Sequence, residues 1–163
     1  MRALAVICYQ NDYVKEPNGY KYAKIIENNI CARITDTLDS DGDVYLIMDW
    51  FPKSNDGEER HLCEIGSEGS EPYGKVSRFL SDVHIIRKNT YGSEDLFKRL
   101  KPYDNIELCG LETHTDVLCN TMIARTCNPN ARIVVRQNCV SSRDFELAEK
   151  AMEIMESVGV DVI

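Results

Sequence analysis

Apolar residues along the chain form two alternating patterns: short continuous runs and longer stretches with helical spacing. Continuous runs of about five residues are typical of strands buried on both faces of a parallel sheet. Residues 3–8 and 44–48 are such runs, and further strands, with polar residues among the apolar ones, are expected at 84–88, 106–109, 131–135 and 160–163. Helical stretches are expected at residues 20–37, 74–82, 93–101, 114–127 and 143–158. This alternation predicts a three-layer α/β fold, with a parallel six-stranded sheet and helices on both faces.

Local signals mark the ends of several predicted elements. Ser93 precedes two acidic residues and is a favourable N-cap for the helix at 93–101. Gly159 is suited to end the last helix. Residues 50–74 are rich in Gly and Pro and have no periodicity, so they predict one long irregular loop.

Three residues with reactive side chains stand at or beyond the carboxyl ends of predicted strands. Cys8 ends the first strand, Lys88 ends the third, and Asp116 follows the fourth. In open parallel sheets, ligands bind beyond these strand ends, near the switch in strand order. We therefore expect a thiol, an ammonium group and a carboxylate to share one site.

Length and charge narrow the possible functions. A chain of 163 residues fits one domain, spanning 1–163. The net charge of −8 argues against nucleic acid, which selects basic surfaces. No apolar run approaches the ~18 residues that span a bilayer, so no membrane contact is expected. The first apolar stretch turns polar after six residues and predicts a core strand, not a signal peptide.

The chain has seven cysteines, without CxxC spacing. An odd number in this pattern argues against a zinc site or a complete disulfide framework. Two of them, Cys63 and Cys139, fall in predicted loops, and the other five lie in apolar segments where a thiol is commonly buried. Together with the absence of an export signal, this favours a reducing cytoplasm.

Five segments, in order, resemble motifs of the isochorismatase-like cysteine hydrolases, a superfamily that includes nicotinamidases. The resemblance covers essentially the whole chain and implies a Rossmann-type strand order for the predicted sheet. The segments are Cys8-Tyr-Gln-Asn-Asp-Tyr13, Asp49-Trp-Phe-Pro52, His61-Leu-Cys-Glu-Ile-Gly-Ser-Glu-Gly69, Arg87-Lys-Asn-Thr-Tyr-Gly-Ser93 and Gly110-Leu-Glu-Thr-His-Thr-Asp116-Val. In that family, an Asp in the first motif is the catalytic base and a Cys in the last motif is the nucleophile.

In this chain the two residue types are exchanged. The resemblance implies Cys8 as nucleophile, Asp116 as base and Lys88 as the charge-stabilising residue of an amidohydrolase that acts on a small carboxamide through a thioester. Such an enzyme cleaves C–N bonds other than peptide bonds. Cys8, at a strand end, has no helix terminus to lower its pKa and would depend on Lys88. Asp116 sits at the expected helix terminus, which should keep it ionised and a weaker base.

The resemblance also implies the surroundings of the reactive groups. Backbone N–H groups of Glu112 and Asp116 would form the oxyanion hole, after a non-proline cis peptide at Leu111–Glu112. The side chains expected to line the substrate pocket are Tyr13, Trp50, Phe51 and His114, with an exposed loop position as the alternative for His114.

Several alternatives stay open. Cys119, one helical turn after Asp116, is the other candidate nucleophile. Asp49 and His61 are a remnant of the metal site of nicotinamidases, but Phe51 replaces an expected His, and two ligands do not make a zinc site. We therefore expect no metal or other cofactor. The chain would be a homodimer or homotetramer, as is general in the family. The competing function is a catalytically inactive relative that binds a small metabolite or a protein partner.

Overall fold

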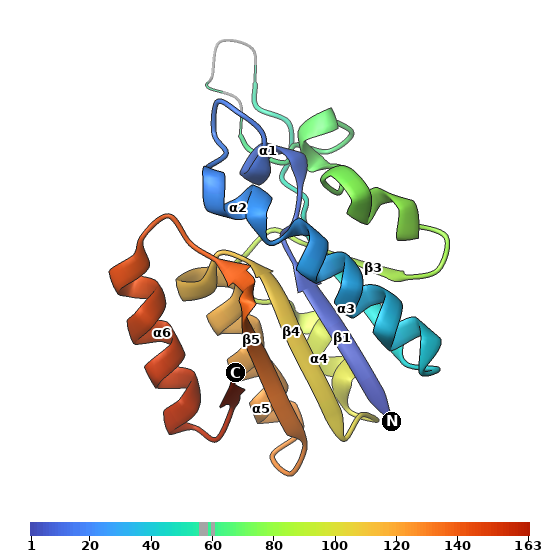
Figure 1. The fold of residues 1–163 in the computed structure, drawn as a ribbon. Helices are drawn as coiled ribbons and strands as arrows, with labels where there is room; N and C mark the ends of the chain where they lie inside the picture. The colour runs from blue at the N-terminus through green and yellow to red at the C-terminus, as the bar shows by residue number, and fades with distance from the viewer. Residues whose placement is uncertain (56–58, 60) are drawn as a thin grey trace.

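A computed structural model describes residues 1–55, 59 and 61–163 of the chain. Its six strands form one sheet in the order β3-β2-β1-β4-β5-β6, and every neighbouring pair is parallel (Figure 1). The strands are β1 (Arg2–Ile7), β2 (Asp43–Asp49), β3 (His84–Lys88), β4 (Asn105–Leu111), β5 (Arg132–Ser141) and β6 (Asp161–Val162). The predicted α/β fold and Rossmann-type strand order are confirmed.

Helices cover both faces of this sheet. The helical elements are α1 (Asn11–Val14), α2 (Lys21–Ile25), α3 (Glu27–Asp39), η1 (Glu68–Ser70), η2 (Gly74–Phe79), α4 (Glu94–Leu100), η3 (Thr113–Val117), α5 (Leu118–Cys127) and α6 (Phe145–Ser157). Each face of the sheet has its own hydrophobic core. Helices α2, α3 and η2 contribute side chains to the core on one face, and α4, α5 and α6 contribute side chains to the core on the other face. No helix of the described part of the chain is long and apolar enough to cross a membrane.

The continuous apolar runs are explained by these two cores. In β1, Leu4 and Val6 pack toward α3, whereas Ala3, Ala5 and Ile7 pack toward the opposite helices. All five are at most 2% exposed. Successive side chains of a strand point to opposite faces, so a central strand must be apolar at every position. Each large aliphatic side chain buried in this way contributes about 1.5–3 kcal/mol.

Three predicted elements differ in extent. The helix expected at 20–37 is two helices, because the backbone at Ile26 (φ −77°, ψ −7°) interrupts the ladder between α2 and α3. The helix expected at 74–82 is the 3-10 helix η2. Strand β5 continues to Ser141 instead of ending at 135, across a register shift relative to β4. The loop expected at 50–74 contains positions 56–58 and 60, which lie outside the described residues.

Candidate active site

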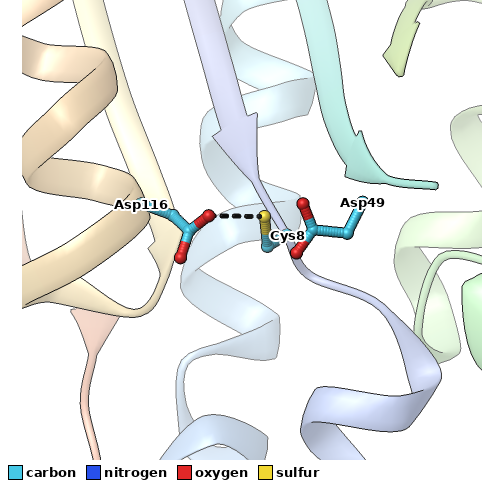
Figure 2. A group of neighbouring side chains, drawn as sticks. All are labelled: Cys8, Asp49 and Asp116. Atoms are coloured by element: carbon cyan, nitrogen blue, oxygen red, sulfur yellow. Dashed lines mark hydrogen bonds between the residues drawn. The ribbon is translucent and has the colours of Figure 1, made fainter. Parts of the chain in front are cut away.

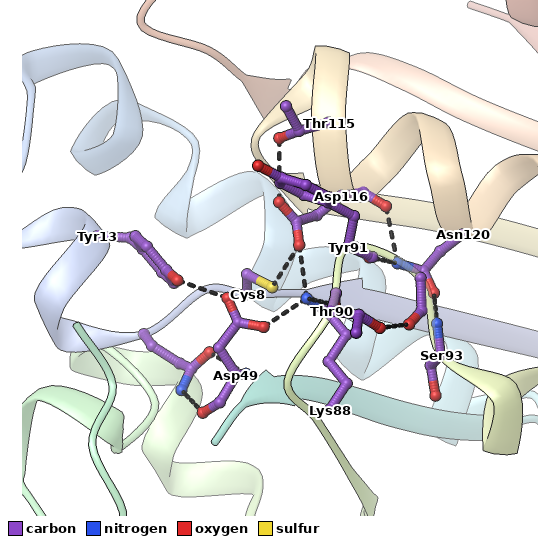
Figure 3. A network of polar contacts seen from close by, with 12 residues as sticks. Cys8, Tyr13, Asp49, Lys88, Thr90, Tyr91, Ser93, Thr115, Asp116 and Asn120 are labelled. Carbon is purple, nitrogen blue, oxygen red and sulfur yellow. Dashed lines mark hydrogen bonds and ion pairs between the residues drawn. The ribbon is translucent and has the colours of Figure 1, made fainter. Parts of the chain in front are cut away.

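The three reactive residues predicted from the strand ends lie together at the carboxyl edge of the sheet (Figure 3). Cys8 follows β1 directly, Lys88 is the last residue of β3, and Asp116 lies in the π-helical turn η3 after β4. Asp49, the last residue of β2, is paired in register with Lys88. The strand order therefore brings one thiol, one ammonium group and two carboxylates to a single point.

Lys88 is at the centre of this group, which we call the Lys88 cluster: Cys8, Asp49, Lys88 and Asp116. Its Nζ is 2.5 Å from Oδ1 of Asp49 and 2.5 Å from Oδ1 of Asp116. It also donates to the carbonyl oxygen of Thr90, at 2.9 Å. Burial alone would lower the pKa of Lys88, but the acidic groups of Cys8, Asp49 and Asp116 outweigh it and raise the pKa. Lys88 is therefore a permanent buried cation.

The Cys8 thiol lies between the two carboxylates (Figure 2). Its Sγ donates to Oδ1 of Asp116 over 3.6 Å, and the residue is 2% exposed. Burial, followed by the charges of Asp49 and Asp116, raises the pKa of Cys8 well above its ordinary value, and Lys88 offsets this only in part. Lys88 lowers the pKa of Cys8, as expected, but does not outweigh burial and the two carboxylates. Cys8 is a neutral thiol beside a hydrogen-bond acceptor.

Asp116 differs from its expected state. Burial raises its pKa, and Lys88 only partly opposes this. Asp116 lies in the first turn of η3, which leads directly into α5, so it is at the expected helix terminus, but burial outweighs the effect expected of that terminus on its pKa. Its second oxygen accepts a hydrogen bond from the Thr115 hydroxyl, at 3.0 Å. A carboxylate with a raised pKa is a stronger base for a nearby thiol.

Asp49 is fully engaged inside the cluster. One oxygen contacts Lys88, and the other accepts a 2.5 Å hydrogen bond from the Tyr13 hydroxyl. Cys8, Asp49 and Asp116 are the one group of three possible metal ligands among the described residues, and His61 is exposed and not part of it. A divalent ion on these carboxylates would lie against the Lys88 ammonium group, so the cluster does not fit a metal.

A cavity of about 530 Å³ opens in front of the cluster. Two of the expected pocket residues, Tyr13 and Phe51, line it, and so do the two carboxylates Asp49 and Asp116. Cys8 and Lys88 are not among the lining residues, so they lie behind the carboxylates. The cavity therefore presents an acidic floor backed by a thiol and an ammonium group.

The other sequence-predicted residues lie elsewhere. The Trp50 ring packs against Arg87, whose Cζ is 4.1 Å from the ring centroid. Nδ1 of His114 is hydrogen-bonded to the Ser142 hydroxyl. Cys119 is in the first turn of α5, and burial raises its pKa. None of these three predicted residues lines the cavity, because each side chain is directed to other partners or to the helix surface.

The loop after β4 contains the residues that were expected to form an oxyanion hole. The Leu111–Glu112 peptide is cis, as predicted. The carbonyl oxygen of Glu112 accepts hydrogen bonds from the N–H groups of Thr115 and Val117, which lie in the η3 turn. Glu112 and Asp116 both line the cavity.

The sequence did not identify one charged pair at the cavity wall. Arg143 donates from Nε to Oε1 of Glu112, at 2.9 Å, and both residues line the cavity. Arg143 reaches this position because β5 runs on to Ser141. One sequence feature could have indicated that the strand continues beyond residue 135: the apolar pair Cys139-Val140 follows three polar residues.

Comparison with known proteins agrees with this architecture. A sequence model of the isochorismatase domain matches residues 2–163. A nicotinamidase of Bacillus subtilis is 27% identical, with a TM-score of 0.86 over 99% of this chain and 98% of that chain. A nicotinamidase of Staphylococcus aureus is 26% identical, with a TM-score of 0.80 over 99% and 97%. A zinc complex of Pyrococcus horikoshii pyrazinamidase, at 20% identity and a TM-score of 0.84 over 99% and 98%, supports the fold alone. Curated protein sequences show no significant match.

Proposed function

The chain belongs to the isochorismatase domain family, and from this premise we propose that it is an amidohydrolase that cleaves the C–N bond of a small carboxamide. In this proposal Cys8 is the nucleophile, Asp116 is the general base and Lys88 stabilises the charges between them. The observation that carries the proposal is a continuous contact: Sγ of Cys8 is 3.6 Å from the same Asp116 oxygen that lies 2.5 Å from Nζ of Lys88.

Proton transfer within the Lys88 cluster is the first step. Asp116 takes the proton of the Cys8 thiol as sulfur attacks the carbonyl carbon. The raised pKa of Asp116 favours this transfer, whereas the raised pKa of Cys8 opposes a free thiolate. The transfer moves one negative charge from carboxylate to sulfur and leaves the total charge of the cluster unchanged. Lys88 contacts the cluster throughout, so the buried charge stays compensated.

The remaining steps reuse the same groups. Attack by sulfur produces a tetrahedral oxyanion, for which the N–H groups of Glu112 and Asp116 are the proposed donors. Collapse of this species breaks the C–N bond, and protonated Asp116 returns its proton to the leaving ammonia. Asp116 then removes a proton from water, which attacks the Cys8 thioester. When the C–S bond breaks, Asp116 returns this proton to sulfur, which restores the Cys8 thiol and releases a carboxylic acid.

The cavity suggests a small substrate with an apolar, flat body. Tyr13, Phe51 and Tyr91 supply aromatic surface around a volume of about 530 Å³. Aromatic rings of a substrate stack favourably on such side chains. Nicotinamidases are among the similar structures, so nicotinamide and related aromatic carboxamides are the first substrates to assay.

The test combines turnover with detection of the thioester. Ammonia release is measured for a panel of small carboxamides with the wild-type protein, Cys8→Ala and the matched thiol variant Cys119→Ala. Acid-quenched samples are then digested and searched by mass spectrometry for an acyl group on cysteine. We expect Cys8→Ala to abolish turnover, Cys119→Ala to retain it, and the acyl group to be found on Cys8. Turnover that survives Cys8→Ala and is lost in Cys119→Ala would refute the proposal.

One observation favours a second candidate, a protein that binds a carboxamide without cleaving it. Cys8 is 2% exposed and lies behind the carboxylates that face the cavity. A ligand could fill the cavity without its carbonyl reaching the sulfur. This candidate predicts a thermal shift with members of the same panel, no ammonia release, and no acyl group on any cysteine.

A further inference from the structure

A second buried ion cluster lies at the amino ends of the strands, away from the proposed active site. Its centre is Glu107 in β4, which is 6% exposed. Arg33 contacts the carboxylate from Nε at 2.6 Å and from Nη2 at 2.8 Å. Arg136 donates from Nε at 3.1 Å, and Nη2 of Arg2 lies at 3.7 Å. We call Arg2, Arg33, Glu107 and Arg136 the Glu107 cluster.

This cluster forms one wall of a cavity of about 390 Å³. Its charged lining consists of four guanidinium groups and two carboxylates: Arg2, Arg33, Arg132, Arg136, Asp36 and Glu107. The lining is therefore positive, in a protein whose net charge is −8. In Figure 1 the lower parts of β4 and β5 face the viewer at this place, between α3 and α6. The cavity is accessible from solvent at the sheet surface.

Two of the arginines keep most of their donors available. Arg132 is bound through Nε to Asp161, at 2.8 Å, and Arg136 is bound through Nε to Glu107. Among the described residues, the Nη1 and Nη2 groups of both arginines have no hydrogen-bond partner. Arg132 and Arg136 point to the same side of β5 because side chains alternate along a strand. Their unused Nη groups thus line one cavity.

From this arrangement we propose that the cavity binds a small phosphate-bearing anion. The planar guanidinium fork pairs with two oxygens of a phosphate, and its charge is permanent. Glu107 already holds the side chains of Arg33 and Arg136 in place, so these two arginines lose little conformational freedom when an anion binds. The cavity has the size of a small-molecule site.

Two competing occupants differ in charge and size. A long polyanion such as nucleic acid would meet the remaining acidic surface of the chain, because the net charge of −8 repels it outside the cavity. The acidic outer face of α6 from a second copy, which carries exposed Glu146, Glu149 and Glu153, would instead make the cavity a subunit interface. Both alternatives are outcomes of the experiment below.

The experiment is calorimetric titration of the full chain with inorganic phosphate and pyrophosphate at low ionic strength. The variants are the double substitution Arg132→Gln/Arg136→Gln and, as a matched loss of two positive charges, Arg78→Gln/Arg99→Gln at exposed positions. We expect pyrophosphate to bind the wild type more tightly than phosphate does. Binding should weaken at least about tenfold in the first variant and change little in the second. Raising the salt concentration should weaken binding, as for any exposed charge pairing.

Three results would overturn the proposal. The first is a wild type that binds neither anion with a Kd below about 1 mM. The second is equal weakening in both double variants, which would indicate a general charge effect. The third is conversion of an oligomer to a monomer by Arg132→Gln/Arg136→Gln in light scattering, which would identify the cavity as a subunit interface. Because the assay measures anion binding alone, its outcome is independent of carboxamide hydrolysis.

Discussion

The two ends of the sheet have buried ion clusters of opposite design. At the carboxyl ends, one ammonium group, Lys88, lies between the carboxylates of Asp49 and Asp116. At the amino ends, one carboxylate, Glu107, lies among three guanidinium groups. The central group determines what the outer groups can do. Around a cation, they are acids that can exchange protons with a thiol, whereas around an anion, they are arginines that keep their protons and can bind another anion.

The difference in burial strengthens this contrast. The side chains of Lys88, Asp49 and Asp116 are 3%, 6% and 14% exposed. Glu107 is comparably buried at 8%, but its partners Arg33 and Arg136 are 20% and 33% exposed. Removing the central charge should therefore lower the unfolding free energy more at the carboxyl ends, because the partner side chains there stay buried and cannot be solvated.

The largest effect is expected from Lys88→Met. This change leaves two carboxylates within one buried cluster without a cation, and breaking a buried ion pair in this way costs about 3–5 kcal/mol of unfolding free energy. Turnover should fall by about 10²–10³ because the charge on the reacting groups is no longer stabilised. Urea unfolding and ammonia release measure the two losses. Lys98→Met, at an exposed surface pair, is the control and should leave both quantities unchanged.

Glu107→Gln should have a smaller effect of another kind. The three arginines can rehydrate, so we expect the unfolding free energy to fall by about 2 kcal/mol, which is typical of charged hydrogen bonds. The Lys88 cluster is untouched, so ammonia release by the folded protein should equal that of the wild type. Anion binding should be at least as strong as in the wild type, because the substitution removes one negative charge from the cavity lining. A large loss of turnover in Glu107→Gln would contradict the separation of the two clusters.

The sequence predicted the carboxyl-end cluster much better than the amino-end one. Cys8 and Lys88 end predicted strands, and the parallel topology places such ends side by side. Glu107 and Arg136 lie within strands, where neither spacing nor capping marks a polar residue as functional. Only the register of β4 and β5, with its shift between Leu108 and Gly110, brings them together. That register depends on the complete sheet and cannot be read from one strand.

The protonation states of the site residues also could not be predicted from the sequence. Position 116 was expected at a helix terminus that keeps the carboxylate ionised, and Asp116 does lie in the first turn of η3. Its pKa is raised by burial, an effect set by the packing of distant segments around it. The rise in the pKa of Asp116 depends on the three-dimensional packing of Tyr13, Asp49 and Lys88, which come from separate parts of the chain.

The pH dependence of turnover gives a sharper test of the carboxyl-end cluster. Asp116 acts as a base only when deprotonated, and its pKa is raised, so activity should fall on the acidic side at a pH above the ordinary pKa of an aspartate. Asp49 is one of the groups that raise this pKa. In Asp49→Asn the acidic limb of kcat/KM should therefore move to lower pH. A limb that stays in place or moves to higher pH would exclude Asp116 as the titrating base.

Metal removal separates this cluster from a metal-dependent site. Lys88 occupies the position between the carboxylates where a divalent ion would have to compete with an ammonium group. Dialysis against EDTA, followed by assay in metal-free buffer, should leave ammonia release unchanged. Loss of activity that is restored by added zinc would show that the site holds a metal in spite of Lys88.

The smallest effect is expected from Tyr13→Phe. Burial and the neighbouring Asp49 raise the pKa of Tyr13, so its hydroxyl remains a hydrogen-bond donor to Asp49 at any working pH. Removing the Tyr13 hydroxyl should lower the unfolding free energy by about 1 kcal/mol, the usual contribution of one hydrogen bond. Turnover should fall by less than about tenfold, because Lys88 still holds Asp49 in place. Tyr91→Phe, at an exposed position on the same cavity, controls for loss of a hydroxyl from the wall. If Tyr13→Phe abolished turnover while Tyr91→Phe did not, the Tyr13 hydroxyl would have to contact the reacting groups, and the arrangement proposed for the Lys88 cluster would need to include it.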